Sequence, residues 1–266
     1  EMWVNVGKSS TVGEFADALK VIGNPLFHSL AADRNGDAFY GEISAIPNVT
    51  EKKMEECIVG INAVVRSLTN NAILALDGTR SDCQWGADAD APQDSGLFGF
   101  ASLPSFFTTE YAANSNDSYW LSNPEQPLEG FPTTMGFIGH EGQQQNLRTQ
   151  ITHEMVGQRL EGTDGFDASP GFTLSSLQQL MYANRVFAAD LTLDDVLTVC
   201  TETAWPEIFP PPGGKRACDV LSQWDRLANI DSRGTQVFTE FWKAISAGGA
   251  AFEHAVNDQS LRFEGF

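Results

Sequence analysis

The segment HSLAADRNGDAFYGEIS, residues 28–44, has the pattern of a β-hairpin. Asn35-Gly36 is the strongest short-range hairpin signal, because both central residues of a type I′ turn need a positive φ. The residues on either side of this pair resemble strands, and Pro47 ends the second one. The segment therefore predicts two strands joined by a type I′ turn.

Further elements are predicted on both sides of this hairpin. Thr11 and Glu14 have the spacing of a capping box, and apolar residues follow at helical spacing until Gly23, which is expected to end the helix. Aromatic residues return over Phe106–Leu121 and predict two strand-like flanks around the polar stretch 114–118.

The second half of the chain has helical periodicity. Apolar residues recur at helical spacing from about Gln143 to Ile245, and a proline-rich stretch, 206–213, interrupts them. The sequence is therefore β-rich over 1–140 and mainly helical over 141–266, which predicts an α+β fold.

The composition limits the partners of the protein. The 266 residues include 16 Lys+Arg and 35 Asp+Glu, a net charge of −19. Such an acidic surface argues against binding to nucleic acid or to anionic membranes. No apolar run approaches the roughly 18–20 residues of a membrane span, so we expect no membrane partner.

The four cysteines fall into two local pairs, Cys57/Cys83 and Cys200/Cys218. Their spacing suits two local disulfides, which would indicate a periplasmic or secreted protein, and the alternative is four buried free thiols in a cytosolic protein. Neither pair is C-x-x-C, and the four histidines lack metal-ligand spacing, so no metal site is predicted.

Two polar segments have alternative interpretations. Asp88 and Asp90 lie in a predicted long ordered loop, 77–104, and hint at calcium, but the Glu that closes an EF-hand loop is missing, which favours a solvated acidic loop. Residues 114–118, Asn-Ser-Asn-Asp-Ser, are typical of an Asx turn. Alternatively, an amide in this stretch donates to an oxyanion.

Three blocks of sequence carry a resemblance to a known family. They are SLAADRNG (29–36), NSNDSYWLSNP (114–124) with PLEGF (127–131), and RACDVLSQWD (216–225) with ANIDS (228–232). In this order they resemble the β-subunit of the penicillin acylase family, particularly the branch that deacylates acyl-homoserine lactones and cyclic lipopeptides such as aculeacin.

The resemblance implies an N-terminal-nucleophile (Ntn) hydrolase. Its fold is an αββα sandwich, of which this chain would form part, with an attached helical subdomain. A serine at the N-terminus of the β-subunit attacks an amide carbonyl, and its own α-amine is the base, so no metal or organic cofactor is needed. We expect this serine to lie outside Glu1–Phe266, and therefore no amidase activity from these residues alone.

The resemblance also implies roles for individual residues. The second asparagine of the Asn-x-Asn block, Asn116, would help form the oxyanion hole, and Arg148 would support the active-site network. Leu26 stands where some relatives carry a tryptophan that lines the acyl pocket, so Leu26 and Phe27 are expected to bind substrate. Both cysteine pairs match disulfides, Cys57–Cys83 and Cys200–Cys218.

The expected partners are a small N-acyl substrate and the remaining α- and β-subunit segments of an acylase. The expected location is periplasmic or secreted. The alternative is a non-catalytic, disulfide-stapled binding or structural module.

Overall fold

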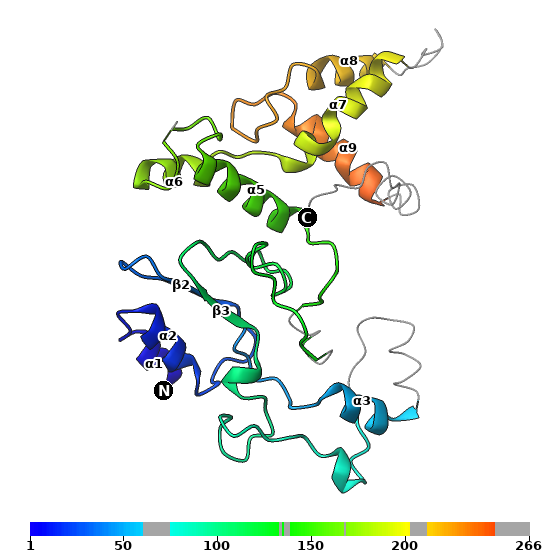
Figure 1. The fold of residues 1–266 in the computed structure, drawn as a ribbon. Helices are drawn as coiled ribbons and strands as arrows, with labels where there is room; N and C mark the ends of the chain where they lie inside the picture. The colour runs from blue at the N-terminus through cyan, green and yellow to red at the C-terminus, as the bar shows by residue number, and fades with distance from the viewer. Residues whose placement is uncertain (61–74, 133–134, 136–138, 168, 203–211, 248–266) are drawn as a thin grey trace. The chain divides into compact units, whose positions relative to one another are not determined.

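The computed structural model of the chain describes residues 1–60, 75–132, 135, 139–167, 169–202 and 212–247 (Figure 1). Their contacts divide the chain into two units, Glu1–His153 and Glu154–Phe266. The sequence pattern changes near residue 140, and the domains predicted from that change, 1–140 and 141–266, stay a prediction. Each unit is described by itself.

The predicted hairpin is present, but its turn differs from the prediction. β1 (Ser29–Ala32) and β2 (Ala38–Gly41) pair antiparallel through a loop longer than two residues. Within it, Asp33 Oδ1 accepts from Asn35 N at 2.8 Å, and Asp33 O accepts from Gly36 N at 3.3 Å. Only Gly36 of the Asn-Gly pair has a positive φ, 93°. The prediction of a type I′ turn is therefore wrong, because the side chain and the carbonyl oxygen of Asp33 close a different local turn.

A third strand makes β2 the centre of a small antiparallel sheet. β3 (Ser105–Thr108) pairs with β2 on the edge away from β1, giving the order β1-β2-β3. Phe39 faces Phe107 with ring centroids 4.9 Å apart, and Tyr40 faces Phe106 at 5.7 Å. These cross-strand pairs fix the register and place β2, all of whose residues are buried, in the core of the first unit.

The predicted helix after Thr11 is confirmed, with an earlier end. α2 covers Val12–Leu19, and Thr11 Oγ1 accepts from Glu14 N at 3.2 Å. Ile22, rather than Gly23, adopts a positive φ of 47° after the helix. The first unit also contains α1 (Met2–Val6), α3 (Glu51–Cys57), η1 (Ser81–Cys83) and η2 (Phe100–Ser102).

The aromatic stretch forms one strand, not two. β3 precedes the polar stretch as predicted, but residues 119–121 lie in bends and turns. Ser118 Oγ accepts from Trp120 N at 3.1 Å, and Tyr119 O accepts from Ser122 N at 3.2 Å. These local bonds use the backbone groups that a second strand would need for pairing.

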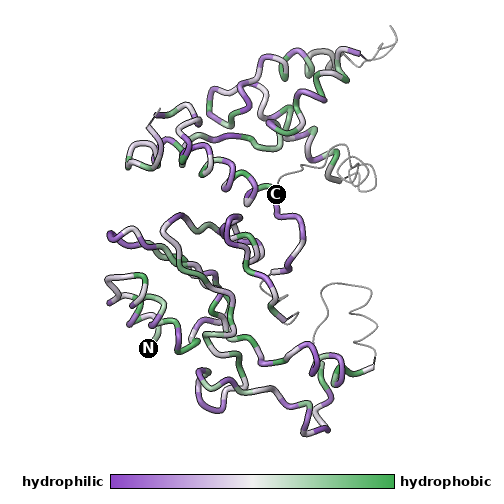
Figure 2. Tube along the Cα trace, viewed as in Figure 1, coloured by the Kyte–Doolittle hydropathy of each residue, from purple (hydrophilic) through white to green (hydrophobic). Residues whose placement is uncertain are grey.

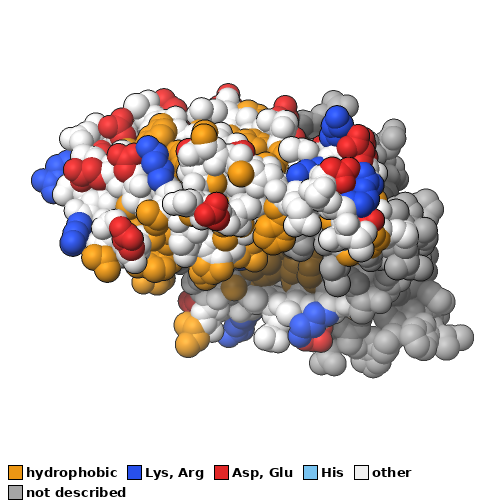
Figure 3. All heavy atoms as spheres, turned by 90° about the horizontal axis from the view of Figure 1, so that it is seen from below, with side chains coloured by type: hydrophobic (Ala, Val, Ile, Leu, Met, Phe, Trp, Pro, Cys, Tyr) orange, Lys and Arg blue, Asp and Glu red, His pale blue; other side chains and the backbone are white. Residues whose placement is uncertain are grey.

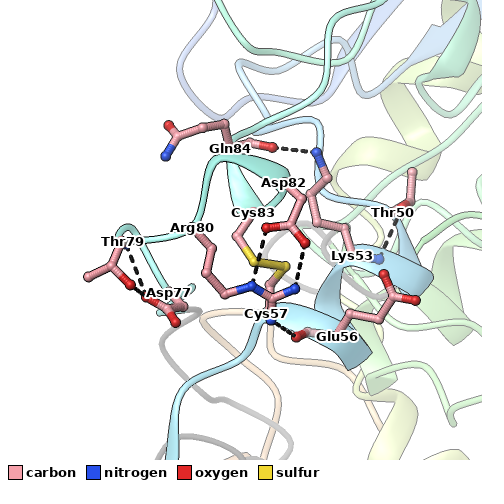
Figure 4. The surroundings of a disulfide bond; sticks show 10 residues. All are labelled: Thr50, Lys53, Glu56, Cys57, Asp77, Thr79, Arg80, Asp82, Cys83 and Gln84. Atoms are coloured by element: carbon pink, nitrogen blue, oxygen red, sulfur yellow. Dashed lines mark hydrogen bonds and ion pairs between the residues drawn. A yellow bond between two sulfur atoms is a disulfide. The ribbon is translucent and has the colours of Figure 1, made fainter.

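The disulfide Cys57–Cys83 is present and joins the end of α3 to η1 (Figure 4). Beside it, Arg80 Nη1 donates to Glu56 O at 3.1 Å, and Arg80 also pairs with the Asp82 carboxylate. The covalent bond and these contacts tie the loop to α3.

The loop 77–104 is ordered, as predicted, but Asp88 is not simply a solvated acid. Its Oδ1 accepts from Asn48 Nδ2 at 2.7 Å, and its Oδ2 accepts from Gly99 N at 2.9 Å and Ser102 Oγ at 2.7 Å. Burial alone would raise the pKa of Asp88, but these hydrogen bonds to the carboxylate outweigh the effect of burial and hold the pKa below its usual range.

The second unit is helical. Its elements, shown in Figure 1, are most of α5 (Leu147–Glu161), α6 (Leu174–Met181), α7 (Phe187–Glu202), α8 (Pro212–Leu221) and α9 (Thr235–Ala247). The helix predicted to include Trp224 and Ala228 ends earlier, at Leu221. Trp224 instead packs against Phe238, with ring centroids 5.3 Å apart, in the core of this unit.

The disulfide Cys200–Cys218 is also present and joins α7 to α8.

Hydrophobic and hydrophilic residues are mixed along the helices of this unit, as Figure 2 shows. No helix in the described ranges is both long and apolar enough to cross a bilayer. Acidic and basic side chains are interspersed with apolar ones on the face drawn in Figure 3. The chain thus combines helices with a small sheet, which agrees with the predicted α+β class.

Replacing either cysteine pair with alanine should destabilise its unit by roughly 3 kcal/mol, because each bond closes a short loop and restricts the unfolded chain. Chemical denaturation of each variant measures this loss. Mass spectrometry of the unreduced protein should find only the two local pairs. Four free thiols, or pairing between the halves, would contradict the assignment.

Asp88→Asn should lower the free energy of unfolding by about 1–2 kcal/mol at pH 7, because an amide cannot accept all three bonds. The ionised Asp88 contributes stability above its unfolded pKa of about 3.9, and this contribution is lost as the pH falls through the lower folded pKa. The difference between wild type and variant should therefore shrink below about pH 4. Denaturation curves from pH 7 to 3 measure it, and a difference that stays constant would contradict this role.

Candidate functional site

The polar stretch 114–118 forms a turn closed by the side chain of Asn114, as predicted, but the Asn114 oxygen bonds to the backbone three residues on and not two residues on as in an Asx turn. Asn114 Oδ1 accepts from Asp117 N at 3.2 Å, and Asn114 Nδ2 donates to the carbonyl oxygens of Asp117 and Ser118 at 3.1 and 3.3 Å. A Cβ at Gly139 would come within 2.3 Å of Ser118 Cα, so the close approach of these backbones requires glycine. Asn114 thus shapes the turn, and Gly139 supports it from one side.

Asn116 lies at the exposed tip of this turn with a positive φ of 57°. Asparagine tolerates this left-handed conformation better than most residues with a Cβ. Among the described residues, no group accepts a hydrogen bond from Asn116 Nδ2, whereas Asn116 Oδ1 accepts from Arg148 Nη1 at 3.4 Å. The structure therefore brings together the two residues for which the resemblance implied a role at the active site.

Arg148 is placed by the beginning of α5. The side chain of Asn146 caps the helix, since its Oδ1 accepts from Arg148 N at 2.9 Å and from Thr149 N at 3.1 Å. Arg148 is thus the second residue of α5, and its exposed side chain extends from the helix to Asn116.

Sequence reasoning did not single out Asp117, which connects the turn to α5. Its Oδ2 accepts from Asn146 N at 2.6 Å and from Thr149 Oγ1 at 2.9 Å, while its Oδ1 accepts from Ser118 N at 2.9 Å. An acidic residue beside the Asn-x-Asn pair is the only sequence signal that points to this contact.

Two more contacts fix α5 against this region. Ser115 Oγ lies 3.0 Å from Thr152 Oγ1, and Tyr111 Oη lies 3.0 Å from His153 Nδ1. His153 is buried, and burial lowers its pKa because desolvation disfavours the charged imidazolium. His153 therefore helps to hold α5 in place, and its burial favours the neutral imidazole.

Leu26 and Phe27 lie in the loop before β1, where their side chains are 51% and 57% exposed. Phe27 N donates to Ser44 Oγ at 3.3 Å, and Phe27 O accepts from Asn24 Nδ2 at 2.9 Å. The backbone of this loop is thus fixed while two large apolar side chains remain accessible. No hydrogen bond between described residues joins Leu26 or Phe27 directly to Asn116 or Arg148.

A chain of polar groups connects this loop to the turn through the core. His28 Nδ1, adjacent to Phe27, lies 2.8 Å from Tyr40 Oη and 2.6 Å from Glu42 Oε2. The Tyr40 hydroxyl, whose pKa is raised by burial, bonds to Ser122, and Ser122 Oγ lies 3.5 Å from Asn114 Nδ2. The central strand β2 therefore supports both groups of candidate residues.

Comparison with known proteins identifies relatives that match nearly the full length of this chain. A profile of the family described as penicillin amidase matches residues 1–262. Aculeacin-A acylase from Actinoplanes utahensis is 39% identical over 259 residues, which are 94% of this chain and 31% of the relative. Acyl-homoserine lactone acylase PvdQ from Pseudomonas syringae pv. syringae (strain B728a) is 28% identical over 266 residues, 97% of this chain and 31% of the relative. The chain spans about a third of the length of these curated relatives.

The family match includes all three sequence blocks on which the resemblance rests, and with them the turn that carries Asn116. It also extends over both units of the structure. The chain therefore belongs to the penicillin amidase family.

Proposed function

We propose that this chain forms part of an acylase that hydrolyses the amide bond of N-acyl compounds, releasing a carboxylic acid and an amine. The names of the relatives specify aculeacin A and acyl-homoserine lactones. Lipopeptides, acyl-homoserine lactones and penicillin-like amides are the substrate classes that we assign to this chain.

The contact between Arg148 and Asn116 is the observation that carries this proposal. A guanidinium group has donors but no acceptor, so the amide atom that faces it must be the oxygen. The NH₂ group of Asn116 is then the end that remains available to a ligand. A neutral donor on a fixed backbone suits the stabilisation of an oxyanion, because it needs no reorganisation during the reaction.

The proposed mechanism uses a nucleophile from outside Glu1–Phe266. The hydroxyl of an N-terminal serine attacks the amide carbonyl carbon, and the α-amine of the same serine takes the proton. The carbonyl oxygen becomes negative and accepts a hydrogen bond from Asn116 Nδ2, while the positive charge of Arg148 lies nearby. The carbon–nitrogen bond breaks, the amine leaves with a proton, and water hydrolyses the acyl-serine ester. No metal or organic cofactor takes part in these steps.

The remaining parts of the proposal concern the surroundings of the site. The exposed apolar side chains of Leu26 and Phe27 would contact the acyl group of the substrate. The sheet β1-β2-β3 would belong to an αββα Ntn-hydrolase sandwich, completed by the remaining α- and β-subunit segments. Two disulfides favour a periplasmic or secreted location, because such bonds persist in oxidising compartments.

Asn116→Ala, made in the mature protein that contains this chain, should lower kcat for a long-chain N-acyl amide by about 10²–10³-fold with little change in KM. Steady-state release of the amine measures both constants. Asn35→Ala, on the exposed hairpin loop, is the matched control and should leave kcat unchanged. Absence of amide hydrolysis by the wild-type protein would refute the proposed function.

A second substitution separates loss of the amide from strain in the turn. Alanine is strained at the positive φ of residue 116, whereas glycine is not. Asn116→Gly should therefore lose as much kcat as Asn116→Ala. Recovery of activity with glycine would show that the backbone, not the amide, is what matters.

A further inference from the structure

The Asp117 carboxylate uses both of its oxygens to join two elements. One oxygen, Oδ1, accepts from Ser118 N within the turn at 2.9 Å. The other, Oδ2, accepts from Asn146 N at 2.6 Å and from Thr149 Oγ1 at 2.9 Å, at the start of α5. The negative charge lies beside the helix N-terminus, where it complements backbone N–H groups that lack partners within the helix.

The residues that Asp117 contacts are the neighbours of Arg148 in the sequence. Asn146 caps α5 and Thr149 lies in its first turn, so the two stand on either side of Arg148, and Asn116 precedes Asp117. Of the contacts that join the turn to α5, those of the Asp117 carboxylate therefore lie closest in the sequence to both Asn116 and Arg148. Their contact, 3.4 Å, is at the long end of the hydrogen-bond range, so even a small shift of α5 would break it.

From this arrangement we propose that Asp117 is a positioning residue for the pair Asn116–Arg148. It does not touch the substrate. It holds α5 so that Arg148 fixes the amide of Asn116 with its NH₂ group toward the oxyanion. This inference rests on the proposed function, in which Asn116 is the oxyanion donor.

The chemistry of the amide isostere makes the inference testable. Asparagine at 117 has one accepting oxygen where aspartate has two, so its NH₂ group must face either Ser118 N or the pair Asn146 N and Thr149 Oγ1. At least one backbone N–H then loses its acceptor, and α5 shifts relative to the turn. A misplacement of about 1 Å can reduce a rate by about 10²-fold.

The first experiment compares kinetic constants in the mature protein. Asp117→Asn should lower kcat by at least about tenfold and leave KM within about twofold, since the lost interaction matters in the transition state. The matched control is Asp225→Asn, because Asp225 also accepts from a backbone N–H and a serine hydroxyl, but in the second unit. That control should keep the wild-type kcat. An unchanged kcat in Asp117→Asn would overturn the inference.

A double-mutant cycle distinguishes positioning from a general loss of structure. In the Asn116→Gly background there is no amide to orient, so adding Asp117→Asn should reduce kcat by less than about twofold. If Asp117→Asn causes the same loss in both backgrounds, Asp117 does not act through Asn116, and the inference is wrong.

Thr149 provides a second test in case Asp117→Asn does not fold. Thr149→Ser keeps the hydroxyl that donates to Asp117 and should keep kcat, whereas Thr149→Val removes it at similar volume and should lower kcat severalfold. Equal activity of these two variants would contradict the inference. A wild-type protein without acylase activity would instead refute the proposed function and remove the basis for this inference.

Discussion

Hydrogen bonds between the turn 114–118 and the first turns of α5 hold the candidate site in one geometry. Asn116 and Arg148 both have exposed side chains, so burial does not fix either of them. Their relative position depends instead on Asp117, which binds the start of α5, and on the contact between Ser115 and Thr152. Without these bonds, a flexible arginine near an asparagine would have no single arrangement.

The core of the first unit gives this turn a rigid base. β2 lies between β1 and β3 and is buried along its whole length. Tyr40 on this strand reaches Ser122, which lies next to Asn114, and it also contacts His28 beside the exposed Phe27. An accessible polar turn and an accessible apolar loop are thus both supported by one buried strand, as binding sites on loops generally require.

Local patterns were sufficient to predict most of the regular elements. The capping residue Thr11 and the apolar spacing of α5 are properties of short segments, and both are present in the structure. A polar turn at Asn114 was predicted for the same reason, because the residues that close it lie only three and four positions away. The spacing of the cysteines could not decide between disulfides and free thiols, and the family resemblance was needed to assign the two disulfides.

Contacts between distant residues were not predictable. Asp33 closes its own turn and also accepts from Val12 N at 3.1 Å, so its role depends on α2 as well as on the hairpin. Asp88 was expected to be solvated, but its acceptors are used by Asn48, Gly99 and Ser102. Likewise, the bond from Asp117 to Thr149 joins residues far apart in the sequence. No periodicity or short motif reports contacts of this kind.

A crystal structure of the mature protein with a boronic acid analogue of the acyl group tests the role of Asn116 most directly. Such a compound forms a tetrahedral adduct with a serine nucleophile and places an oxygen where the oxyanion would develop. We expect Asn116 Nδ2 within about 2.7–3.1 Å of that oxygen, with Arg148 on the Oδ1 side of the amide. An adduct whose oxygens are bound by other groups, with Asn116 turned away, would contradict the central claim.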